Sequence, residues 1–345
     1  MLEIKDIKQD KHERVVRGLD ATTGLDALIV VNNTNLGPAT GGCRAMHYSS
    51  HEDQLYDNSN LAEGMTYKNA LAGLNFGGGK ATINTAAEDL TEDKLKTFAD
   101  LLNEVNKDGL VYTTAGDIGT TSEHLYTLRE HTQFVINPAG TDSGESTAFG
   151  VLMAMHGALQ SIGQVFSDQI VAVSGYGKVG KRLTKFLRDE GAQVIVSDVV
   201  TPDIEYVPHS LGMGQVSTAH ADGTVWSPCA VGNIVTPERV HMMHDNTIIC
   251  GGANNQLYNN DIVNAAMAQK GITYVPDYLA NSGGVIIVAA RQEHDDYTLE
   301  YDSEPVMEKL RGIRQTTWDI MLESFRTGTP TEVLANAMAE ERFNK

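Results

Sequence analysis

The chain has 345 residues, which suits two domains of roughly 100–200 residues each. Its net charge of −19 argues against a nucleic-acid or anionic membrane partner, because both need a basic face. Three scattered cysteines, Cys43, Cys229 and Cys250, argue against a disulfide framework and fit a reducing cytoplasm. The N-terminus lacks the apolar core of a signal peptide, and the apolar run 285–290 is too short to cross a membrane.

The first third of the chain mixes strand and helix patterns. Apolar residues predict a strand over 27–31 and helices over about 52–72 and 91–106. The stretch from Thr120 to Glu123 is a capping-box pattern, so a further helix is expected from there to about His131. Residues 137–144 are rich in turn formers and mark a domain boundary.

The second part of the chain alternates strands with helices. A helix is predicted over 149–162, and helical structure again from about 303 onward. Between them lies a strand–turn–helix–strand unit with its parts at 170–173, 175–180, 181–190 and 193–197. Further strands are predicted at 247–250, 273–275 and 285–288. This alternation is typical of a parallel, doubly wound sheet, so the fold class is α/β.

A glycine-rich turn predicts a dinucleotide site. The residues Gly175-Tyr176-Gly177-Lys178-Val179-Gly180 match G-x-G-x-x-G, follow a strand and open a helix. The first glycine permits the tight turn, the second admits the pyrophosphate and the third lets helix and strand pack closely. The alternative is a glycine turn that binds nothing.

Asp198 ends the next strand, where a carboxylate accepts hydrogen bonds from the adenosine ribose. A carboxylate there repels a 2′-phosphate, and the following residues 199–202 offer no arginine. The predicted cofactor is therefore NAD rather than NADP.

Most lysines are solvated surface residues, but the sequence around Lys68 and Lys80 predicts other surroundings for these two. On a helix, Leu61, Met65, Lys68 and Ala72 share one face, which places Lys68 on an apolar stripe. A lysine there needs an anionic partner, for which a substrate carboxylate is a candidate. Lys80 follows three glycines that let backbone approach a ligand; near a second cation and partly desolvated, it is expected to have a lowered pKa and to act as a general base.

Two further positions are candidates with simple alternatives. Asp117 stands just before the capped helix and completes a set with the lysines, although a turn or cap aspartate is equally compatible. Asn254-Asn255 follows two glycines and is either a turn or a pair of amides that reach cofactor or substrate. The chain has no HExxH, CxxC or G-x-S-x-G motif, so no metal site or serine hydrolase chemistry is predicted.

At this point the chain resembles the glutamate/leucine/phenylalanine/valine dehydrogenases, and within them the leucine dehydrogenases. The resemblance covers nearly the whole chain and rests on six segments in the same order. These segments are Gly37–Arg44, Gly64–Lys80, Thr114–Thr120, Thr147–Gly150, Gly252–Leu257 and Pro276–Val285.

The resemblance implies a reaction and a division of labour. Residues 1–140 would bind substrate and form the oligomer, and residues 141–302 would bind NAD, with the site in a cleft that closes between the domains. The sequence leaves open whether the C-terminal helices 303–345 pack back on residues 1–140. Lys68 would bind the substrate α-carboxylate, Lys80 would activate water, and Asp117 would move protons to and from the amino group. Members of the family form homo-oligomers, and a dimer or octamer is expected here.

The resemblance also implies the remaining contacts. Expected substrate contacts besides Lys68 are Thr40, Gly41, Gly42, Met65, Gly77, Gly78, Ala115, Val285 and Val288. Expected cofactor contacts besides the glycine turn and Asp198 are Thr147, Cys229, Ala230, Asn254 and Asn255, with Thr147 and Asn255 at the nicotinamide end.

The expected side-chain pocket is mostly small or apolar, which favours a branched aliphatic amino acid. Glutamate is disfavoured because the pocket has no extra cation. Three departures from the family concern the substrate: Thr40 stands where leucine is frequent, Gly116 where glutamate is frequent, and Ile287 where asparagine is frequent. A fourth, Ser143–Ser146 in place of a Pro-Ser-Pro-like stretch, concerns the hinge or the nicotinamide contact. Two alternatives stay open: a dehydrogenase of aromatic or modified amino acids, and a non-catalytic NAD-binding oligomer.

Overall fold

The computed structural model describes residues 1–136, 142–199, 210–211, 224–294, 296 and 298–345. The chain divides into two compact units. Unit 1 comprises Met1–Thr141, Arg291–Thr298 and Glu340–Lys345, and unit 2 comprises Asp142–Ala290 and Leu299–Ala339. Among the described residues, no helix is both long and apolar enough to cross a membrane.

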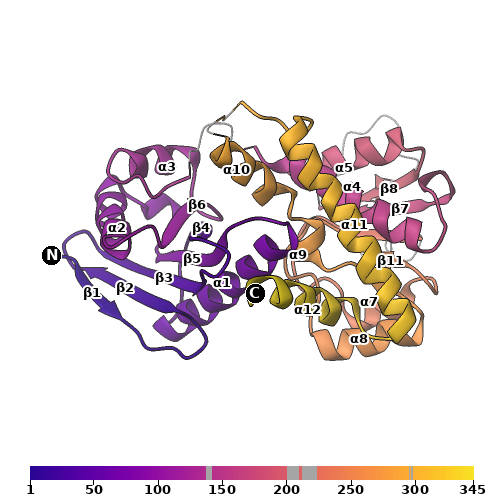
Figure 1. The fold of residues 1–345 in the computed structure, drawn as a ribbon, viewed down its shortest axis with the longest axis horizontal. Helices are drawn as coiled ribbons and strands as arrows, with labels where there is room; N and C mark the ends of the chain where they lie inside the picture. The colour runs from indigo at the N-terminus through magenta and orange to yellow at the C-terminus, as the bar shows by residue number, and fades with distance from the viewer. Residues whose placement is uncertain (137–141, 200–209, 212–223, 295, 297) are drawn as a thin grey trace. The chain divides into compact units, whose positions relative to one another are not determined.

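Unit 1 is built on a six-stranded mixed sheet in the order β1-β2-β3-β5-β4-β6 (Figure 1). Neighbours from β1 to β5 are antiparallel, whereas β4 runs parallel to both β5 and β6. The strands are β1 Glu3–Asp6, β2 Arg14–Asp20, β3 Leu25–Asn33, β4 Ala39–Met46, β5 Gly77–Asn84 and β6 Tyr112–Gly116.

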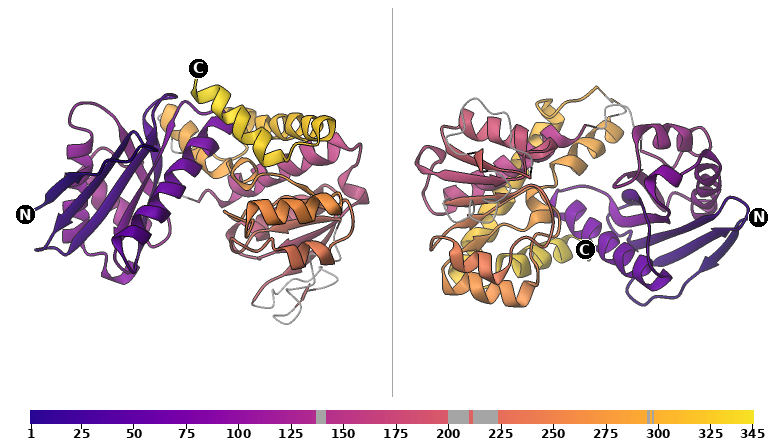
Figure 2. Two further views of the ribbon diagram at one scale, coloured as in Figure 1. Left: turned by 90° about the horizontal axis from the view of Figure 1, so that it is seen from below. Right: turned by 180° about the vertical axis from the view of Figure 1, so that it is seen from behind.

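Helices cover both faces of this sheet (Figure 2). They are α1 His51–Leu71, η1 Ala87–Asp89, α2 Glu92–Val105 and α3 Ser122–Arg129. The strand β3 shows the two faces by its alternation. Ile29 packs in the core that holds the apolar residues of α2 and α3, while Leu28 and Val30 pack with Ala62 of α1.

Unit 2 holds a six-stranded parallel sheet in the order β12-β11-β10-β7-β8-β9. In chain order this is 6-5-4-1-2-3, the arrangement of doubly wound dinucleotide-binding folds. The strands are β7 Ile170–Ser174, β8 Gln193–Ser197, β9 Ser210–Leu211, β10 Val225–Pro228, β11 Ile248–Ile249 and β12 Thr273–Tyr274. The expected two-domain α/β fold is therefore confirmed.

The helices after residue 142 are mainly in unit 2. They are α4 Gly144–Ser161, η2 Phe166–Asp168, α5 Lys178–Asp189, α7 Pro237–Met242, α8 Asn260–Gln269, α9 Asp277–Ala280, α10 Gly283–Glu293, α11 Glu304–Thr327 and α12 Thr331–Phe343. The long helix α11 packs closely on α4, where a Cβ on Gly157 would lie 2.3 Å from the carbonyl of Arg314. The end of α12 returns to unit 1: Tyr67 and Phe343 stack edge to face at 5.6 Å.

Three sequence predictions are corrected by the structure. Residues 285–288, predicted as a strand, lie in α10, since a short apolar run has the same pattern in a buried strand and a buried helix. Ile286, Ile287 and Ala290 are buried at helical spacing. The helix α4 begins at Gly144, ahead of the predicted 149, so the turn-rich boundary ends earlier; its residues 137–141 lie outside the described part.

The third correction concerns the capping box. The residue that caps α3 is Thr121, paired with His124, and not Thr120 with Glu123. Thr120 is unavailable because its hydroxyl lies 3.0 Å from the Cys43 carbonyl and accepts the amide of Asp117 at 2.8 Å. The start of the helix is thus set by a tertiary contact beside Asp117.

Candidate active site

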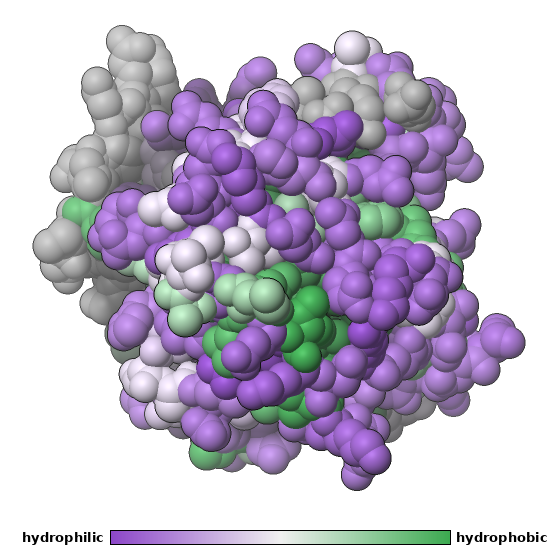
Figure 3. Space-filling view, turned by 90° about the vertical axis from the view of Figure 1, so that its left-hand side faces the viewer, coloured by the Kyte–Doolittle hydropathy of each residue, from purple (hydrophilic) through white to green (hydrophobic). Residues whose placement is uncertain are grey.

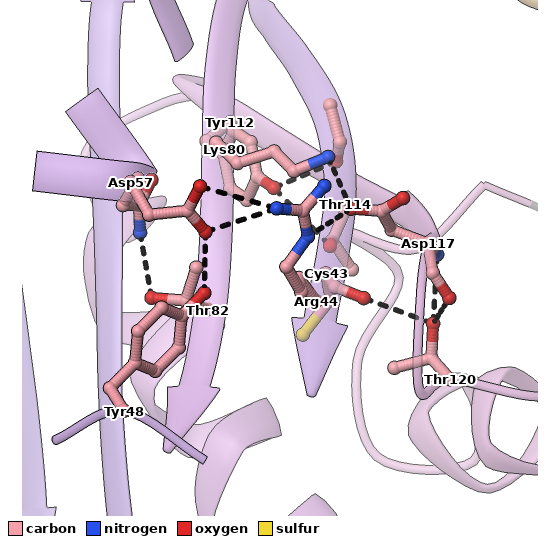
Figure 4. A network of polar contacts seen from close by, with 12 residues as sticks. Cys43, Arg44, Tyr48, Asp57, Lys80, Thr82, Tyr112, Thr114, Asp117 and Thr120 are labelled. Atoms are coloured by element: carbon pink, nitrogen blue, oxygen red, sulfur yellow. Dashed lines mark hydrogen bonds and ion pairs between the residues drawn. The ribbon is translucent and has the colours of Figure 1, made fainter. Parts of the chain in front are cut away.

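Lys80 and Asp117 form the centre of the site in unit 1 (Figure 4). Lys80 lies in β5 and is only 6% exposed, and its Nζ is 2.7 Å from Oδ2 of Asp117, which follows β6. In the register of the sheet Lys80 pairs with Val30, so it points to the face that α1 covers. A buried ammonium and a carboxylate are thereby held together at the edge where β5 and β6 lie on either side of β4.

The glycines around Lys80 let the backbones approach one another. A Cβ on Gly78 would lie 2.1 Å from the amide nitrogen of Thr66 in α1, and one on Gly77 would lie 2.0 Å from the Asn33 carbonyl. A Cβ on Gly41 would collide with the Gly79 carbonyl at 1.8 Å. These glycines are therefore required for packing; the substrate contacts expected of Gly41, Gly77 and Gly78 stay predictions.

The guanidinium of Arg44 is a second cation on Asp117, and the sequence reasoning did not single it out. Its Nε lies 3.1 Å from Oδ2 of Asp117, the oxygen that Lys80 also contacts. Its Nη1 contacts Asp57 of α1 at 3.0 Å, and the Tyr48 hydroxyl donates to the same Asp57 at 2.7 Å. The only sequence signal was that Arg44 closes the Gly37–Arg44 segment.

The carboxylate of Asp117 stays ionised in this setting. Burial acts to raise the pKa of Asp117, but the charges of Lys80 and Arg44 outweigh it and hold the pKa below its ordinary value. Gly42 lies directly against this side chain, because a Cβ there would be 2.8 Å from Cβ of Asp117. The site therefore presents an anion fixed by two cations.

The helix α1 buries a polar face rather than the predicted apolar stripe. Gln54, Asn58, Thr66 and Asn69 are buried, and their side chains bond to the sheet, as when Asn69 donates to the Gly77 carbonyl at 2.7 Å. Leu61, Met65 and Lys68 are half-buried on the neighbouring face. The apolar surroundings expected for Lys68 are thus only partial.

The expected pocket residues are divided between the units. Thr40 and Ala115 are in neighbouring strands β4 and β6, where Thr40 pairs with Thr113 and Gly42 with Ala115. Val285 and Val288 lie half-buried in α10, in unit 2.

In unit 2 the glycine turn has the geometry that a dinucleotide needs. Gly175 has a φ of +107° and Gly177 is the N-cap of α5. A Cβ on Gly180 would lie 1.9 Å from the Gly175 carbonyl, so this glycine is needed for packing. Around Gly177, in contrast, a Cβ would meet nothing within 4 Å, which leaves space for a ligand at the helix N-terminus.

Asp198 is joined to this turn. Its carboxylate accepts the backbone amide of Tyr176, which fixes it at the end of β8. Cys229 follows β10, and its amide donates to the Ser174 carbonyl at 2.7 Å; the neighbouring Ala230 packs against Gly175. Three elements therefore meet at the carboxyl ends of parallel strands, where such folds bind cofactors.

The other expected cofactor residues lie elsewhere in unit 2. Thr147 is in the first turn of α4, and its hydroxyl donates to the Ser143 carbonyl at 2.8 Å. Asn254 accepts a hydrogen bond from Asn281 at 2.8 Å, and Asn255 has a φ of +52°. Within the described residues no cluster of His, Cys, Asp or Glu could hold a metal ion.

Comparison with known proteins covers both units. Residues 12–134 match the dimerisation domain of the Glu/Leu/Phe/Val dehydrogenases. Residues 140–202 and 201–344 match the glutamate/leucine/phenylalanine/valine dehydrogenases.

Individual relatives resemble the chain over almost its full length. Leucine dehydrogenase of Thermoactinomyces intermedius is 35% identical, over 96% of this chain and 91% of that protein. Phenylalanine dehydrogenase of Caldalkalibacillus thermarum is 34% identical, over 97% and 92%. The crystal structure of L-tryptophan dehydrogenase from Nostoc punctiforme matches with a TM-score of 0.82 and 30% identity, over 97% and 96%. The chain therefore belongs to the glutamate/leucine/phenylalanine/valine dehydrogenase family and is an NAD(P)-dependent amino-acid dehydrogenase that acts on CH–NH2 donors.

Proposed function

We propose that the protein catalyses the reversible, NAD-dependent oxidative deamination of leucine, valine or isoleucine to the 2-oxo acid and ammonia. The observation that carries the proposal is the buried Lys80–Asp117 pair, with Nζ and Oδ2 2.7 Å apart. The reaction moves protons to and from the amino group and a water molecule, and this pair places two groups that can exchange protons next to each other.

The residues of unit 1 divide the work as follows. Lys68 binds the α-carboxylate of the substrate through its ammonium group. Asp117 takes a proton from the substrate amino group and returns it to that group when it leaves as ammonia. Lys80 releases its own proton to solvent and then accepts a proton from the water that attacks the iminium carbon, so one proton is released in each turnover. Bound NAD supplies the chemistry of hydride acceptance from Cα.

Asp198 supports NAD over NADP. Its carboxylate is fixed beside the glycine turn by the Tyr176 amide, so it cannot easily swing away from a 2′-phosphate. The test is kcat/KM with each cofactor; a preference for NADP contradicts this part of the proposal.

The pocket residues support a branched aliphatic substrate. Thr40 is buried, and its hydroxyl donates to the Thr113 carbonyl at 3.4 Å, so the hydroxyl bonds to the backbone of β6. Met65 lies near Gly41, whose Cβ position is 3.4 Å from the methionine Cγ. Ala115, in the neighbouring strand β6, is also small and uncharged, so this part of unit 1 suits an aliphatic side chain better than an acidic one.

An aromatic amino acid is the second candidate. Thr40 is smaller than the leucine frequent at this position, which leaves more room, and Ser143–Ser146 departs from the usual stretch. The phenylalanine dehydrogenase relative is also almost as similar to this chain as the leucine dehydrogenase relative, at 34% against 35% identity.

A substrate panel decides between them. NADH formation is followed with leucine, valine, isoleucine, phenylalanine, tryptophan and glutamate at alkaline pH. We expect the highest kcat/KM with a branched aliphatic substrate. A higher kcat/KM with phenylalanine or tryptophan than with leucine supports the second candidate. No turnover with any of these amino acids contradicts both candidates.

Lys80→Ala tests the assignment of the base. Turnover is expected to fall by about a hundredfold or more. The matched control is Lys96→Ala, which removes a surface lysine paired with Glu92 at 2.6 Å and leaves activity unchanged. Retained activity in Lys80→Ala refutes the assigned role.

We also propose a homo-oligomer, a dimer or an octamer, located in the cytoplasm. The match of residues 12–134 to a dimerisation domain supports assembly. So does the apolar patch near the centre of the face shown in Figure 3, because exposed apolar patches mark interaction sites. The cytoplasmic location is supported by the three cysteines of the protein, which are free thiols and suit a reducing compartment. Light scattering measures the size of the assembly.

A further inference from the structure

The guanidinium of Arg44 lies between two carboxylates (Figure 4). Its Nε contacts Oδ2 of Asp117 at 3.1 Å, and its Nη1 contacts Asp57 at 3.0 and 3.2 Å. The side chain of Arg44 is 15% exposed. An arginine held at both ends and largely removed from water has one available geometry, because its fork is planar and rigid.

The carboxylate of Asp57 holds Arg44 in place and does not displace Asp117, because it contacts a different nitrogen of the guanidinium. Asp57 comes from α1 and also accepts the Tyr48 hydroxyl at 2.7 Å. Arg44 and Lys80 together balance Asp57 and Asp117, so the four groups carry no net charge. Because these charges balance and Arg44 is fixed by Asp57, Arg44 holds Oδ2 of Asp117, the same oxygen that Lys80 contacts.

We propose that Arg44, braced by Asp57, is a positioning residue that holds the Asp117 carboxylate in register with Lys80 for proton transfer. The inference rests on the proposed function and adds to it a residue that acts through Asp117 rather than on the substrate. Asp117 follows β6 and Lys80 is in β5, and Arg44 is in the strand β4 between them.

The groups around Asp117 determine how its pKa changes when the charge of Arg44 is removed. Lys80 and Arg44 are the two cations that lower the pKa of Asp117, and Asp57 acts through Arg44. Cys43, Tyr48 and Tyr112 also sense Asp117, but burial raises their pKa values, so they stay neutral through neutral pH. Loss of the arginine charge therefore raises the pKa of Asp117.

The experiment compares Arg44→Gln and Arg44→Lys with Arg17→Gln. Arg17 is the matched control: it makes a two-point ion pair with Asp26 at 3.0 Å between β2 and β3, and both side chains are 23% exposed. The readouts are kcat, KM and the pH profile of kcat/KM, with the melting temperature as the measure of folding.

Arg44→Gln is expected to lower kcat by about ten- to a hundredfold, since a small misplacement of a catalytic group has that effect. The acid limb of its pH profile moves to higher pH, and KM for the amino acid changes less than kcat. Arg44→Lys keeps the charge without the fork, so kcat falls while the acid limb stays near the wild-type position. Arg17→Gln keeps both kcat and the acid limb.

The inference is overturned if Arg44→Gln has the wild-type kcat and acid limb, or if Arg17→Gln shows the same changes. If Arg44→Gln does not fold, Arg44→Lys decides: an unchanged kcat overturns the inference, and a reduced kcat with an unmoved acid limb supports it. Wild-type protein that turns over no amino acid overturns the proposed function itself, and this inference with it.

Discussion

The Nζ of Lys80 and Oδ2 of Asp117 are 2.7 Å apart, although Lys80 lies in β5 and Asp117 follows β6, far along the chain. Lys80 is almost fully buried, so the carboxylate is its compensating charge. The pair therefore serves both the stability of unit 1 and the proton transfers proposed for the reaction.

Asp117→Asn separates these two contributions. Turnover should fall by about a hundredfold or more, because the amide cannot take up a proton. The free energy of unfolding should fall by roughly 2 kcal/mol, as expected for a lost bond to a charged group. Denaturant titration and steady-state kinetics measure the two effects, and wild-type turnover in the variant contradicts the role of Asp117.

The same variant carries a pH signature. The pKa of Asp117 is lowered in the folded protein, so its stabilising effect is full above the unfolded value of about 4. That contribution is lost as pH falls through the lowered folded value. The difference in stability between wild type and Asp117→Asn should therefore shrink on acidification; a difference that grows below pH of about 4 is the opposite result.

Gly78→Ala tests the close approach of α1 to β5. The new methyl group would lie 2.1 Å from both the amide nitrogen and the Oγ1 of Thr66, so the helix that carries Lys68 must shift. We expect a loss of about 1–3 kcal/mol in stability together with a higher KM. Gly64→Ala is the control in the same helix: nothing lies within 4 Å of its Cβ position, and it should stabilise the helix by about 0.5–1 kcal/mol.

Two glycines of the cofactor turn should respond differently to alanine. Gly180→Ala places a methyl group 1.9 Å from the Gly175 carbonyl and should lower the melting temperature. Gly177→Ala meets open space in the protein, so the melting temperature should hold while NAD binding weakens. Calorimetric titration with NAD checks this, and unchanged affinity in Gly177→Ala argues against a pyrophosphate at that position.

Arg342→Ala should loosen the end of α1. The guanidinium of Arg342 donates to the carbonyl of Ala70 in the last turn of α1 and to that of Leu74 just beyond the helix, the latter at 2.8 Å, and so ties the end of the helix in place. Faster hydrogen exchange is expected in the last turn of α1, near Lys68. Arg326→Ala, on an exposed pair with Glu323, is the control that should leave exchange there unchanged.

Features that depend only on neighbouring residues could be predicted from the amino-acid sequence. The glycine turn at Gly175–Gly180 was predicted with its flanking strand and helix, because tight turns and helix starts are encoded locally. The helices α1 and α2 agree with prediction to within one residue at each end, and their N-caps, Ser50 and Thr91, are residue types that favour a helix start. The α/β class followed from the alternation of such elements.

Features that depend on contacts between distant segments could not be predicted in this way. The glycine-rich strands β4 and β5 have too few side chains to show a strand pattern, and their pairing is set by the sheet around them. Likewise nothing near Arg44 in the sequence points to Asp57 or Asp117, because the ion pairs arise where β4, α1 and the end of β6 meet. Residue types pointed to an amino-acid dehydrogenase with Lys80 and Asp117 as candidate residues, but the contacts that hold Asp117 depend on the fold.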